Sequence, residues 1–387
     1  MFLALRELVY ARGRFSLMGV VIALIAVLMV MLSGLSAGLV NDGVSGLKSL
    51  PVSAFAFDAG TRQDNAFSRS VVDADQLTAW QAHPDVADAT PMGVSIVNAE
   101  TDTGAQVDLT IFGVEPDSFL APVVSEGSPL AEPAGVVVSE TLRDEGVEIG
   151  TVVTLDQFGT ELAVVGFTDG QATFGHVDVA YAPLATWQLI TIGQAPEGSA
   201  PTAEDLAALT ADHASVIALQ GVEGSALAAG DAAVLEQGDA TAGTTTMTLE
   251  QSFNASPGYQ AETLTLSMIQ WFLYAIGALV VGAFFTVWTI QRGHELAVLR
   301  AMGASARYLL RDGLAQAAIL LVAFTAVGVA LGIGLGALMP AGMPFALEAG
   351  PIAVASLVTI LLGLVGAAVA VLRVTRIEPI TALGGAR

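Results

Sequence analysis

Four long runs of apolar residues without charged side chains dominate the hydrophobic pattern of this sequence. They cover residues 15–40, 264–290, 314–338 and 352–372. A helix that crosses the ~30 Å hydrocarbon core of a bilayer needs about 20 apolar residues. A charged side chain at the centre of such a helix costs at least ~2.5 kcal/mol of insertion free energy. The four runs therefore predict four transmembrane helices.

The first run has a second interpretation, a secretory signal peptide, because Arg6, Arg12 and Arg14 precede it and small residues follow it. The apolar core of a signal peptide has roughly 7 to 15 residues, which is much shorter than this run. The length favours a membrane anchor. Residues 1–14, MFLALRELVYARGR, predict an amphipathic helix along the inner membrane surface, before the chain turns into the membrane at Gly13.

Residues 41–262, between the first two runs, show the short alternating patterns of a mixed α/β domain. Segments with the composition of strands are 52–57, 93–98, 106–112, 135–139, 151–155, 162–166, 177–181 and 214–220. Helices are predicted at 75–82, at 140–146 with Ser139 as N-cap, at 183–190 and at 202–212. Thr202 and Asp205 form a variant of the capping box. Residues 222–248, rich in Ala, Gly and Thr, are left unassigned.

Basic residues are concentrated in the segments that one side of the membrane would hold. Ten of the fourteen lie before the first run, between the second and third, or after the fourth: Arg6, Arg12, Arg14, Arg292, Arg300, Arg307, Arg311, Arg373, Arg376 and Arg387. The positive-inside rule makes that side cytoplasmic, together with both termini. Residues 41–262 hold four basic and thirty-two acidic residues, a net charge of 4 − 32 = −28. Such a surface argues against nucleic acid as a ligand.

The sequence thus predicts a membrane α-helical protein of a bacterial plasma membrane, with an extracytoplasmic mixed α/β domain inserted between helices one and two. The predicted segments are a cytoplasmic amphipathic helix (1–14), transmembrane helix 1 (15–40), the extracytoplasmic domain (41–262), transmembrane helix 2 (263–290), a cytoplasmic loop (291–313), transmembrane helix 3 (314–338), an outer loop (339–351), transmembrane helix 4 (352–372) and a cytoplasmic tail (373–387).

Motifs for ATP hydrolysis and for metal chemistry are absent from the sequence. A P-loop needs a lysine after a glycine-rich turn, and the only lysine is Lys48, in the outer segment. There is no cysteine and no H-E-x-x-H motif, and the four histidines are scattered and interpreted as surface or structural residues. The apolar runs also lack the carboxylates and lysines of ion-coupled carriers. We therefore expect no enzyme activity, no metal and no intrinsic cofactor, and an energy source on another protein.

The cytoplasmic loop has the pattern of a short helix with one apolar face. Leu296, Leu299 and Met302 recur every three residues, which would leave an apolar stripe for a partner to cover. Gly303 is expected to end this helix with a positive φ, and Ser305 to cap the next one. The alternative is a helix that lies on the lipid headgroups.

At this loop the sequence resembles a known family. QRGHELAVLRAMGASARYLLRDGLAQ (291–316) is similar to the signature loop of FtsX-like ABC transporter permeases of the MacB or mechanotransmission type. RVTRIEPITAL (373–383) resembles the family's C-terminal end, and GVVVSETLRDEGVEIGTVVTL (135–155) resembles its extracytoplasmic core. The order of the four predicted helices and the position of the outer domain agree with the same family.

The resemblance implies that the loop couples this chain to a separate ABC ATPase subunit. It assigns this role to Arg292, Glu295, Leu296, Leu299, Arg300, Met302 and Gly303. It further implies a homodimer in membrane lipid with two ATPase copies, and with helices one and two at the dimer interface. Gly34 and Gly38 form a GxxxG pair in the first run, compatible with close helix approach, and Gly328, Gly332 and Gly336 repeat the spacing in the third.

The N-terminal segment LRELVYARGRFSLMG and the compact outer domain look most like the heme-exporter permeases of Gram-positive bacteria. This resemblance implies an efflux pump that extracts heme from the outer leaflet by ATP-driven mechanotransmission, with heme as the transported ligand. The alternatives are a non-transporting regulator of a cell-wall hydrolase, an exporter of a peptide or antibiotic, and a stand-alone membrane receptor.

A heme site at the outer leaflet would need apolar walls and a ligand for iron. With no cysteine, and with no histidine expected near the membrane, the candidates are Glu262, Tyr259, Met268, Met29 and Met31. A carboxylate can bind ferric iron, and Glu262 stands where the chain enters the second apolar run. The alternative interpretation of Glu262 is a solvated acid near a helix start, and that of the methionines is core packing.

Overall fold

The computed structural model describes residues 12–210, 212–291, 298, 302–340 and 343–375. The chain divides into two compact units. The outer domain is Val40–Glu262, and the membrane unit is formed by the chain before and after it. This division follows the two points at which the composition changes from apolar to polar and back.

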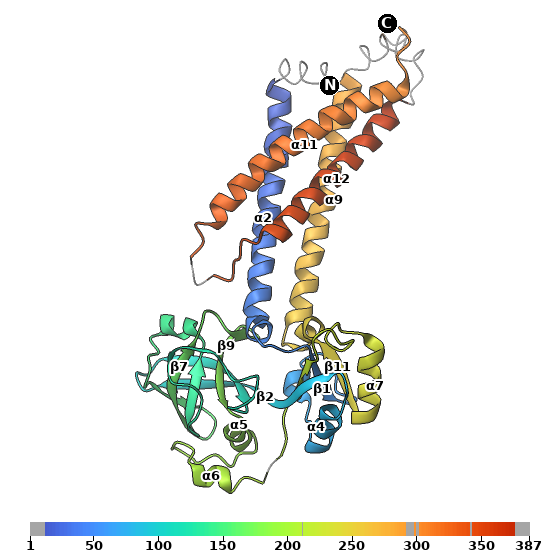
Figure 1. Ribbon diagram of the computed structural model, residues 1–387. Coiled ribbons are helices and arrows are strands. Elements are labelled where there is room, and N and C mark those ends of the chain that lie inside the picture. The colour runs from blue at the N-terminus through green and yellow to red at the C-terminus, as the bar shows by residue number, and fades with distance from the viewer. Residues whose placement is uncertain (1–11, 211, 292–297, 299–301, 341–342, 376–387) are drawn as a thin grey trace. The chain divides into compact units, whose positions relative to one another are not determined.

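Four helices in the described part of the chain are long and apolar enough to cross a membrane. They are α2 (Arg12–Lys48), α9 (Tyr259–Gln291), α11 (Ala306–Gly336) and α12 (Ala349–Thr375) (Figure 1). The predicted turn at Gly13 is wrong, because α2 is already helical at Arg12 and runs on through Gly13. One glycine costs a helix only about 1 kcal/mol, which the long apolar run that follows can offset. Residues 1–11 of the predicted amphipathic helix lie outside the described residues.

Glycines bring the helices of the membrane unit into close contact. A Cβ atom on Gly366 of α12 would lie 2.4 Å from the carbonyl oxygen of Ala278 in α9, so only glycine allows this approach. In α11, a Cβ on Gly328 would lie 2.4 Å from the carbonyl oxygen of Ala23, and one on Gly332 would lie 2.7 Å from Val30. Gly328 and Gly332 of the third predicted helix therefore pack on α2 of the same chain, whereas Gly336 packs on Phe345 and Leu347.

The GxxxG pair of α2, Gly34 and Gly38, is also covered by residues of the same chain. A Cβ on Gly34 would overlap the ring of Phe345 at 2.3 Å, and one on Gly38 would overlap the backbone of Pro344 at 2.2 Å. The backbone N–H of Ala346 donates to the carbonyl of Gly34 over 3.0 Å. This face of α2 thus receives the outer loop between α11 and α12.

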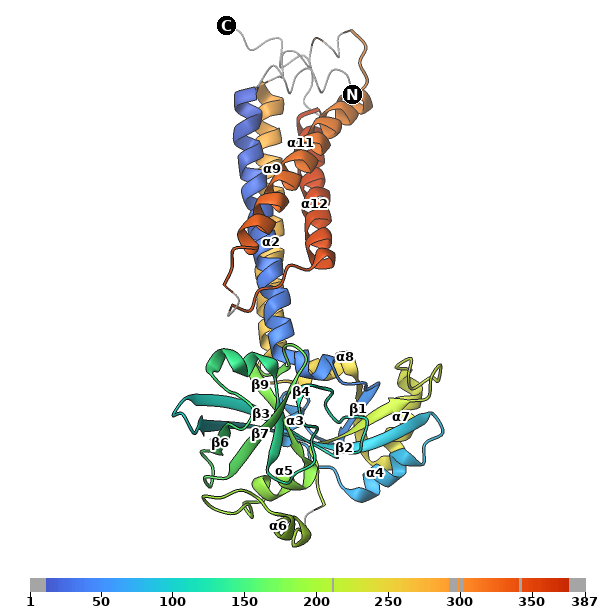
Figure 2. The same cartoon turned by 60° about the vertical axis from the view of Figure 1, so that its left-hand side comes forward.

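An eleven-stranded mixed sheet forms the centre of the outer domain, in the order β11-β1-β10-β2-β3-β9-β5-β7-β4 with β6 and β8 paired beside it (Figures 1 and 2). Its strands are β1 (Ala54–Asp58), β2 (Val86–Thr101), β3 (Gln106–Val114), β4 (Val124–Gly127), β5 (Gly135–Val138), β6 (Val152–Leu155), β7 (Glu161–Thr168), β8 (Thr173–Phe174), β9 (Val177–Pro183), β10 (Val216–Gly221) and β11 (Thr244–Thr248).

The remaining elements of the domain are short helices. They are α3 (Ala66–Arg69), α4 (Ala74–Gln81), the 3-10 helix η1 (Glu140–Glu145), α5 (Leu184–Thr191), α6 (Ala203–Ala207), α7 (Ala232–Ala242), α8 (Leu249–Ser252) and the 3-10 helix η2 (Phe253–Ala255).

The eight predicted strands are confirmed, and the structure adds β4, β8 and β11. β8 has only two residues, and β4 (VSEG) and β11 (TTTMT) lack an apolar run that would stand out in the sequence. The capping box of Thr202 and Asp205 is confirmed at the start of α6. The cap predicted at Ser139 is wrong, because η1 is a 3-10 helix without a side-chain cap. The Ser139 hydroxyl instead accepts a hydrogen bond from the backbone N–H of Ala172 over 3.0 Å.

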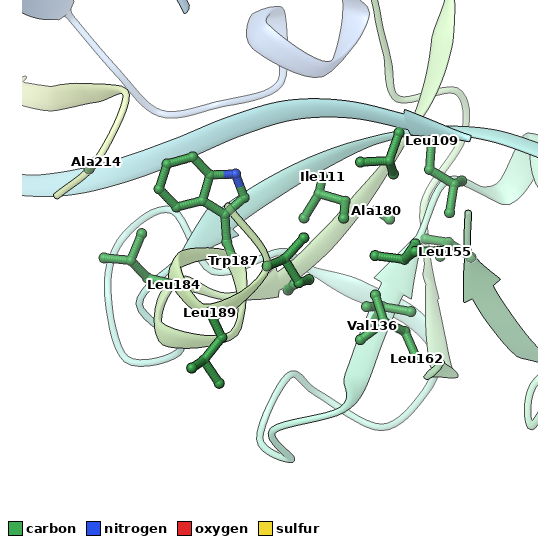
Figure 3. Close-up of a cluster of buried hydrophobic side chains, with 14 of the residues drawn as sticks. Leu109, Ile111, Val136, Leu155, Leu162, Ala180, Leu184, Trp187, Leu189 and Ala214 are labelled. Carbon is green, nitrogen blue, oxygen red and sulfur yellow. The ribbon is translucent and has the colours of Figure 1, made fainter. Parts of the chain in front are cut away.

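Both faces of the sheet are buried. Ala54 and Ala56 of β1 belong to one apolar cluster, whereas Phe55 and Phe57 belong to the other, as the alternation of a strand requires. The first cluster is covered by α5, whose Trp187 packs beside Ile111 and Ala180 (Figure 3). A Cβ on Gly93 would lie 2.2 Å from the Trp187 ring, so a glycine in β2 makes room for the indole.

Candidate functional site

The outer end of α2, the first turn of α9 and the turn between β8 and β9 meet at a histidine placed between two carboxylates. Nδ1 of His176 lies 2.7 Å from Oδ2 of Asp42, at the end of α2. Nε2 lies 2.9 Å from Oε2 of Glu262, in the first turn of α9. All three side chains are partly exposed. We call Asp42, His176 and Glu262 the histidine cluster.

The backbone at the turn between β8 and β9 positions the imidazole. Gly175 has φ 61° and His176 has φ 66°, so two consecutive residues adopt the left-handed conformation. Glycine adopts it readily, whereas at a histidine it is uncommon. The N–H of Gly175 donates to the carbonyl of Gly43 over 2.9 Å, which docks the turn on α2.

Further hydrogen bonds join the end of α2 to β8. Val44 departs from helical geometry, with φ −146° and ψ 15°, and so interrupts α2 at this point. Next to it, the Ser45 hydroxyl lies 2.7 Å from the Thr173 hydroxyl and accepts from the Thr173 N–H over 2.9 Å. Gln171 donates to the Asp42 carboxylate over 2.8 Å. The turn and the helix end therefore form one hydrogen-bonded body.

The geometry of the cluster favours a charged imidazole. A neutral imidazole has one N–H, so its second nitrogen would direct a lone pair at a carboxylate, whereas the protonated ring can donate to Asp42 and Glu262 together. Burial alone would lower the pKa of His176, but the hydrogen bonds and charges of the two carboxylates outweigh burial and raise it.

Two further groups beside the cluster can titrate. Tyr259 of α9 packs near Gly43, where a Cβ would lie 3.8 Å from its ring. Asp178 of β9 accepts a hydrogen bond from Thr141. Burial, followed by the charges of Asp42 and Asp144, raises the pKa of Asp178 despite that bond.

The structure brings together two of the five residues proposed for heme, Tyr259 and Glu262, in the first turn of α9. The expectation that no histidine lies near them is wrong, since His176 bonds Glu262 directly. The two residues are 86 positions apart in the chain, and only the pairing of β8 with β9 and the docking of their turn on α2 bring them together. In the sequence, the only sign of this contact was that a glycine, Gly175, precedes His176, which is typical of a tight turn.

The three proposed methionines have different environments within the membrane unit. Met29 of α2 is buried, at 1% exposure, whereas Met268 of α9 is 52% exposed. Met31 is half-buried and lies two residues beyond Met29, which places it on nearly the opposite side of the helix. The structure thus gives Met29 and Met31 different neighbours and leaves Met268 facing outward.

The structure describes the C-terminal end of the proposed coupling segment, Met302 and Gly303. Gly303 has φ 97°, as predicted for a residue that ends a helix. The Ser305 hydroxyl accepts from the N–H of Tyr308 over 3.2 Å and caps α11, as predicted. Met302 is 72% exposed. The other proposed residues, Arg292, Glu295, Leu296, Leu299 and Arg300, lie outside the described residues.

Two models of known protein families match this chain, one over the first helix and most of the outer domain and one over the later membrane helices. The model of the MacB-like periplasmic core domain matches residues 15–222, which is more than half of the chain. The model of the FtsX-like permease C-terminal region matches residues 267–379. The fold and these matches define a membrane permease with an extracytoplasmic domain. The chain belongs to the MacB-type, FtsX-like family of ABC transporter permeases, and it is a plasma membrane protein whose outer domain is extracellular.

Individual relatives are similar over different lengths. A Staphylococcus haemolyticus protein named hemin transport system permease HrtB is 23% identical over 99% of both chains. Its namesake from Staphylococcus epidermidis is 30% identical over 37% of this chain and 41% of its own.

Solved extracytoplasmic domains are also similar to part of the chain. The periplasmic region of MacB from Actinobacillus actinomycetemcomitans is 11% identical, with a TM-score of 0.37, over 52% of this chain and 91% of that one. The extracellular domain of YknZ from Gram-positive bacteria is 11% identical, with a TM-score of 0.35, over 51% of this chain and 98% of that one.

Proposed function

We propose that this chain is the permease subunit of an efflux pump that extracts heme from the outer leaflet of the plasma membrane. The observation that carries the proposal is the similarity to a protein named for hemin transport, which extends over 99% of both chains. In this proposal two copies of the chain form a homodimer in the lipid bilayer and bind two copies of a separate ABC ATPase. Both termini lie in the cytoplasm, where the ATPase acts, and ATP-driven mechanotransmission moves the cargo.

The site that we propose for heme includes the first turn of α9. Glu262 supplies an anionic oxygen that can bind ferric iron, and Tyr259 supplies an aromatic wall beside it. Because His176 already bonds Glu262 over 2.9 Å, heme has to compete with the imidazole for this carboxylate, or else use the imidazole as well. Met268, exposed on the same helix, and Met29 and Met31 on α2 are the remaining candidates.

Heme titration of the full chain in lipid nanodiscs tests this proposal. We expect ferric heme to give a saturable, shifted Soret band with the wild type. Glu262→Gln keeps the size of the side chain but removes its charge, and we expect it to weaken binding by at least roughly tenfold, the scale of one charged contact. Glu250→Gln, at an exposed carboxylate of α8, is the matched control and should bind heme like the wild type. A wild type that binds no heme would remove the substrate assignment.

The proposed docking of the ATPase has its own test at Met302. Its exposed side chain would lie in the apolar stripe that the ATPase covers, so Met302→Asp should place a charge in the interface. We expect loss of copurification with the ATPase subunit and loss of substrate-stimulated ATP hydrolysis. Met343→Asp changes another exposed methionine, in the outer loop, and should leave both measurements unchanged. Normal copurification of the Met302 variant would contradict the assignment.

A regulator of cell-wall hydrolases is the second candidate, because the FtsX-like match covers most of α9 together with α11 and α12. Such a regulator would bind the ATPase but not heme. Copurification of the ATPase together with a wild type that gives no Soret shift therefore favours the regulator, or an exporter of a peptide or antibiotic. A stand-alone receptor would bind no ATPase subunit.

A further inference from the structure

We propose that His176 is a positioning residue that fastens the outer ends of α2 and α9 to the turn between β8 and β9, so that movement of either helix end is passed to the sheet. The fastening is independent of what the protein transports. The proposal that movement is passed to the sheet does rest on the proposed function. The observation behind it is that one imidazole bonds Asp42 at the end of α2 and Glu262 at the start of α9.

The turn that carries His176 is part of the sheet. β9 begins directly after it and pairs in parallel with β3, from Leu109↔Asp178 to Val114↔Pro183. The Thr110 hydroxyl of β3 donates to the carbonyl of Phe174 over 3.1 Å. Phe174 itself is fully buried in the same apolar cluster as Phe55 and Phe57. A displacement of the turn would therefore disturb β3 and β9, which lie near the middle of the strand order.

The two helix ends are fastened to the turn to different degrees. The end of α2 bonds this region several times, through Gly43 to Gly175, through Ser45 to Thr173 and through Asp42 to Gln171. At the start of α9, Glu262 bonds the turn through His176, whereas the Ser256 hydroxyl just before α9 donates to the carbonyl of Gly43 in α2 and not to the turn. Removal of the imidazole should therefore release the start of α9 more than the end of α2. This asymmetry distinguishes a fastening role from a general loss of stability, which would affect both ends alike.

Hydrogen exchange of the full chain in nanodiscs, without ATP or substrate, tests the fastening. With His176→Ala we expect roughly tenfold faster exchange at residues 259–263, the scale of one lost charged hydrogen bond, a smaller increase at 171–177, and none in β2 and β3. His213→Ala is the matched control, because His213 contacts Thr191 of α5 over 3.3 Å, outside the cluster. It should leave residues 259–263 at the wild-type rate.

Two more variants separate positioning from a merely structural role. His176→Arg retains a positive charge with several N–H donors and should restore most of the protection at 259–263. The double variant His176→Ala with Glu262→Ala should exchange no faster than His176→Ala alone, because the two side chains act through one bond. Additive effects, failure of arginine to restore protection, or wild-type exchange in His176→Ala would each overturn the proposal.

The transfer of movement is tested with the partner ATPase bound. We expect ATP to change the exchange of residues 171–183 in the wild type, and expect His176→Ala to abolish this change while ATP hydrolysis continues. An ATP-driven change that persists in His176→Ala would overturn the transfer. A wild type that shows no ATP-driven change would count against the proposed pump and against the transfer, while the exchange without ATP still decides whether His176 fastens the helices.

Discussion

The outer domain and the membrane unit are stabilised by different physical means. In the outer domain, large side chains are buried on both faces of one sheet, and Phe67 contacts the rings of Phe55, Phe57 and Phe174 edge-on with centroids 5.0–5.3 Å apart. In the membrane unit many large apolar side chains are exposed, such as Leu279 at 72% and Leu17 at 71%. The same residue types therefore form the core in one unit and the surface in the other.

The reason for the difference is the solvent. In water, burial of apolar area drives folding, at roughly 25 cal/mol per Å². In lipid this driving force between helices is absent, and close packing at small residues replaces it. Gly366 beside Ala278 and Gly328 beside Ala23 are such contacts. The comparison predicts that removal of a large side chain damages the outer domain most, and that addition of a side chain damages the membrane unit most.

The largest effect is expected from Phe67→Ala. Phe67 is fully buried, and the loss of a buried phenylalanine costs about 3–5 kcal/mol of unfolding free energy. Urea unfolding of the full chain in nanodiscs, followed by the fluorescence of Trp80 and Trp187 after Trp271 and Trp288 are replaced by Phe, measures this loss. Phe158→Ala, at a side chain that is 44% exposed, is the control and should change the free energy by less than about 0.5 kcal/mol. Equal effects would break the comparison.

A medium effect is expected from Gly366→Leu in the membrane unit. The new side chain would collide with the backbone of α9, and overpacking of this kind costs about 1–3 kcal/mol. Thermal loss of helical circular dichroism in nanodiscs would report it as a lower melting temperature. Gly334→Leu adds the same side chain where no atom lies within 4 Å of the Cβ position. If that control melts like Gly366→Leu, close packing at Gly366 is not what holds α9 and α12 together.

The smallest effect is expected at the partly exposed histidine cluster, which is held by charge rather than by apolar burial or close packing. The pKa of His176 is raised above its ordinary value of 6.5, so the folded state binds the proton more tightly than the unfolded state. The stabilisation from the charged imidazole is then complete below pH 6.5 and is lost as the pH rises through the higher folded pKa. Exchange at residues 259–263, and to a smaller extent at 171–177, should therefore accelerate over this range after correction for the intrinsic pH dependence. A variant with His176→Gln should show no such step, and a wild type without the step would contradict the charged pair.

The sequence was sufficient to predict most of the fold. The four helices follow from the cost of a charge in lipid, and each predicted strand follows from a local run of β-branched and aromatic residues. β8, with only two residues, could not be predicted, because its existence depends on pairing with β9. The close contacts of Gly34 and Gly38 could be predicted as contacts, but not their partner, because Phe345 reaches α2 only through the fold of the outer loop.

The candidate site was predicted in part. Glu262 and Tyr259 stand at the start of an apolar run, which the sequence alone reveals, and the positive φ of Gly303 follows from the helix pattern before it. By itself the sequence determined that the chain has four long apolar helices, because that depends on local composition. Only the tertiary structure decided that His176 meets Glu262, because strand pairing and the docking of one turn on α2 bring together residues that no local pattern connects.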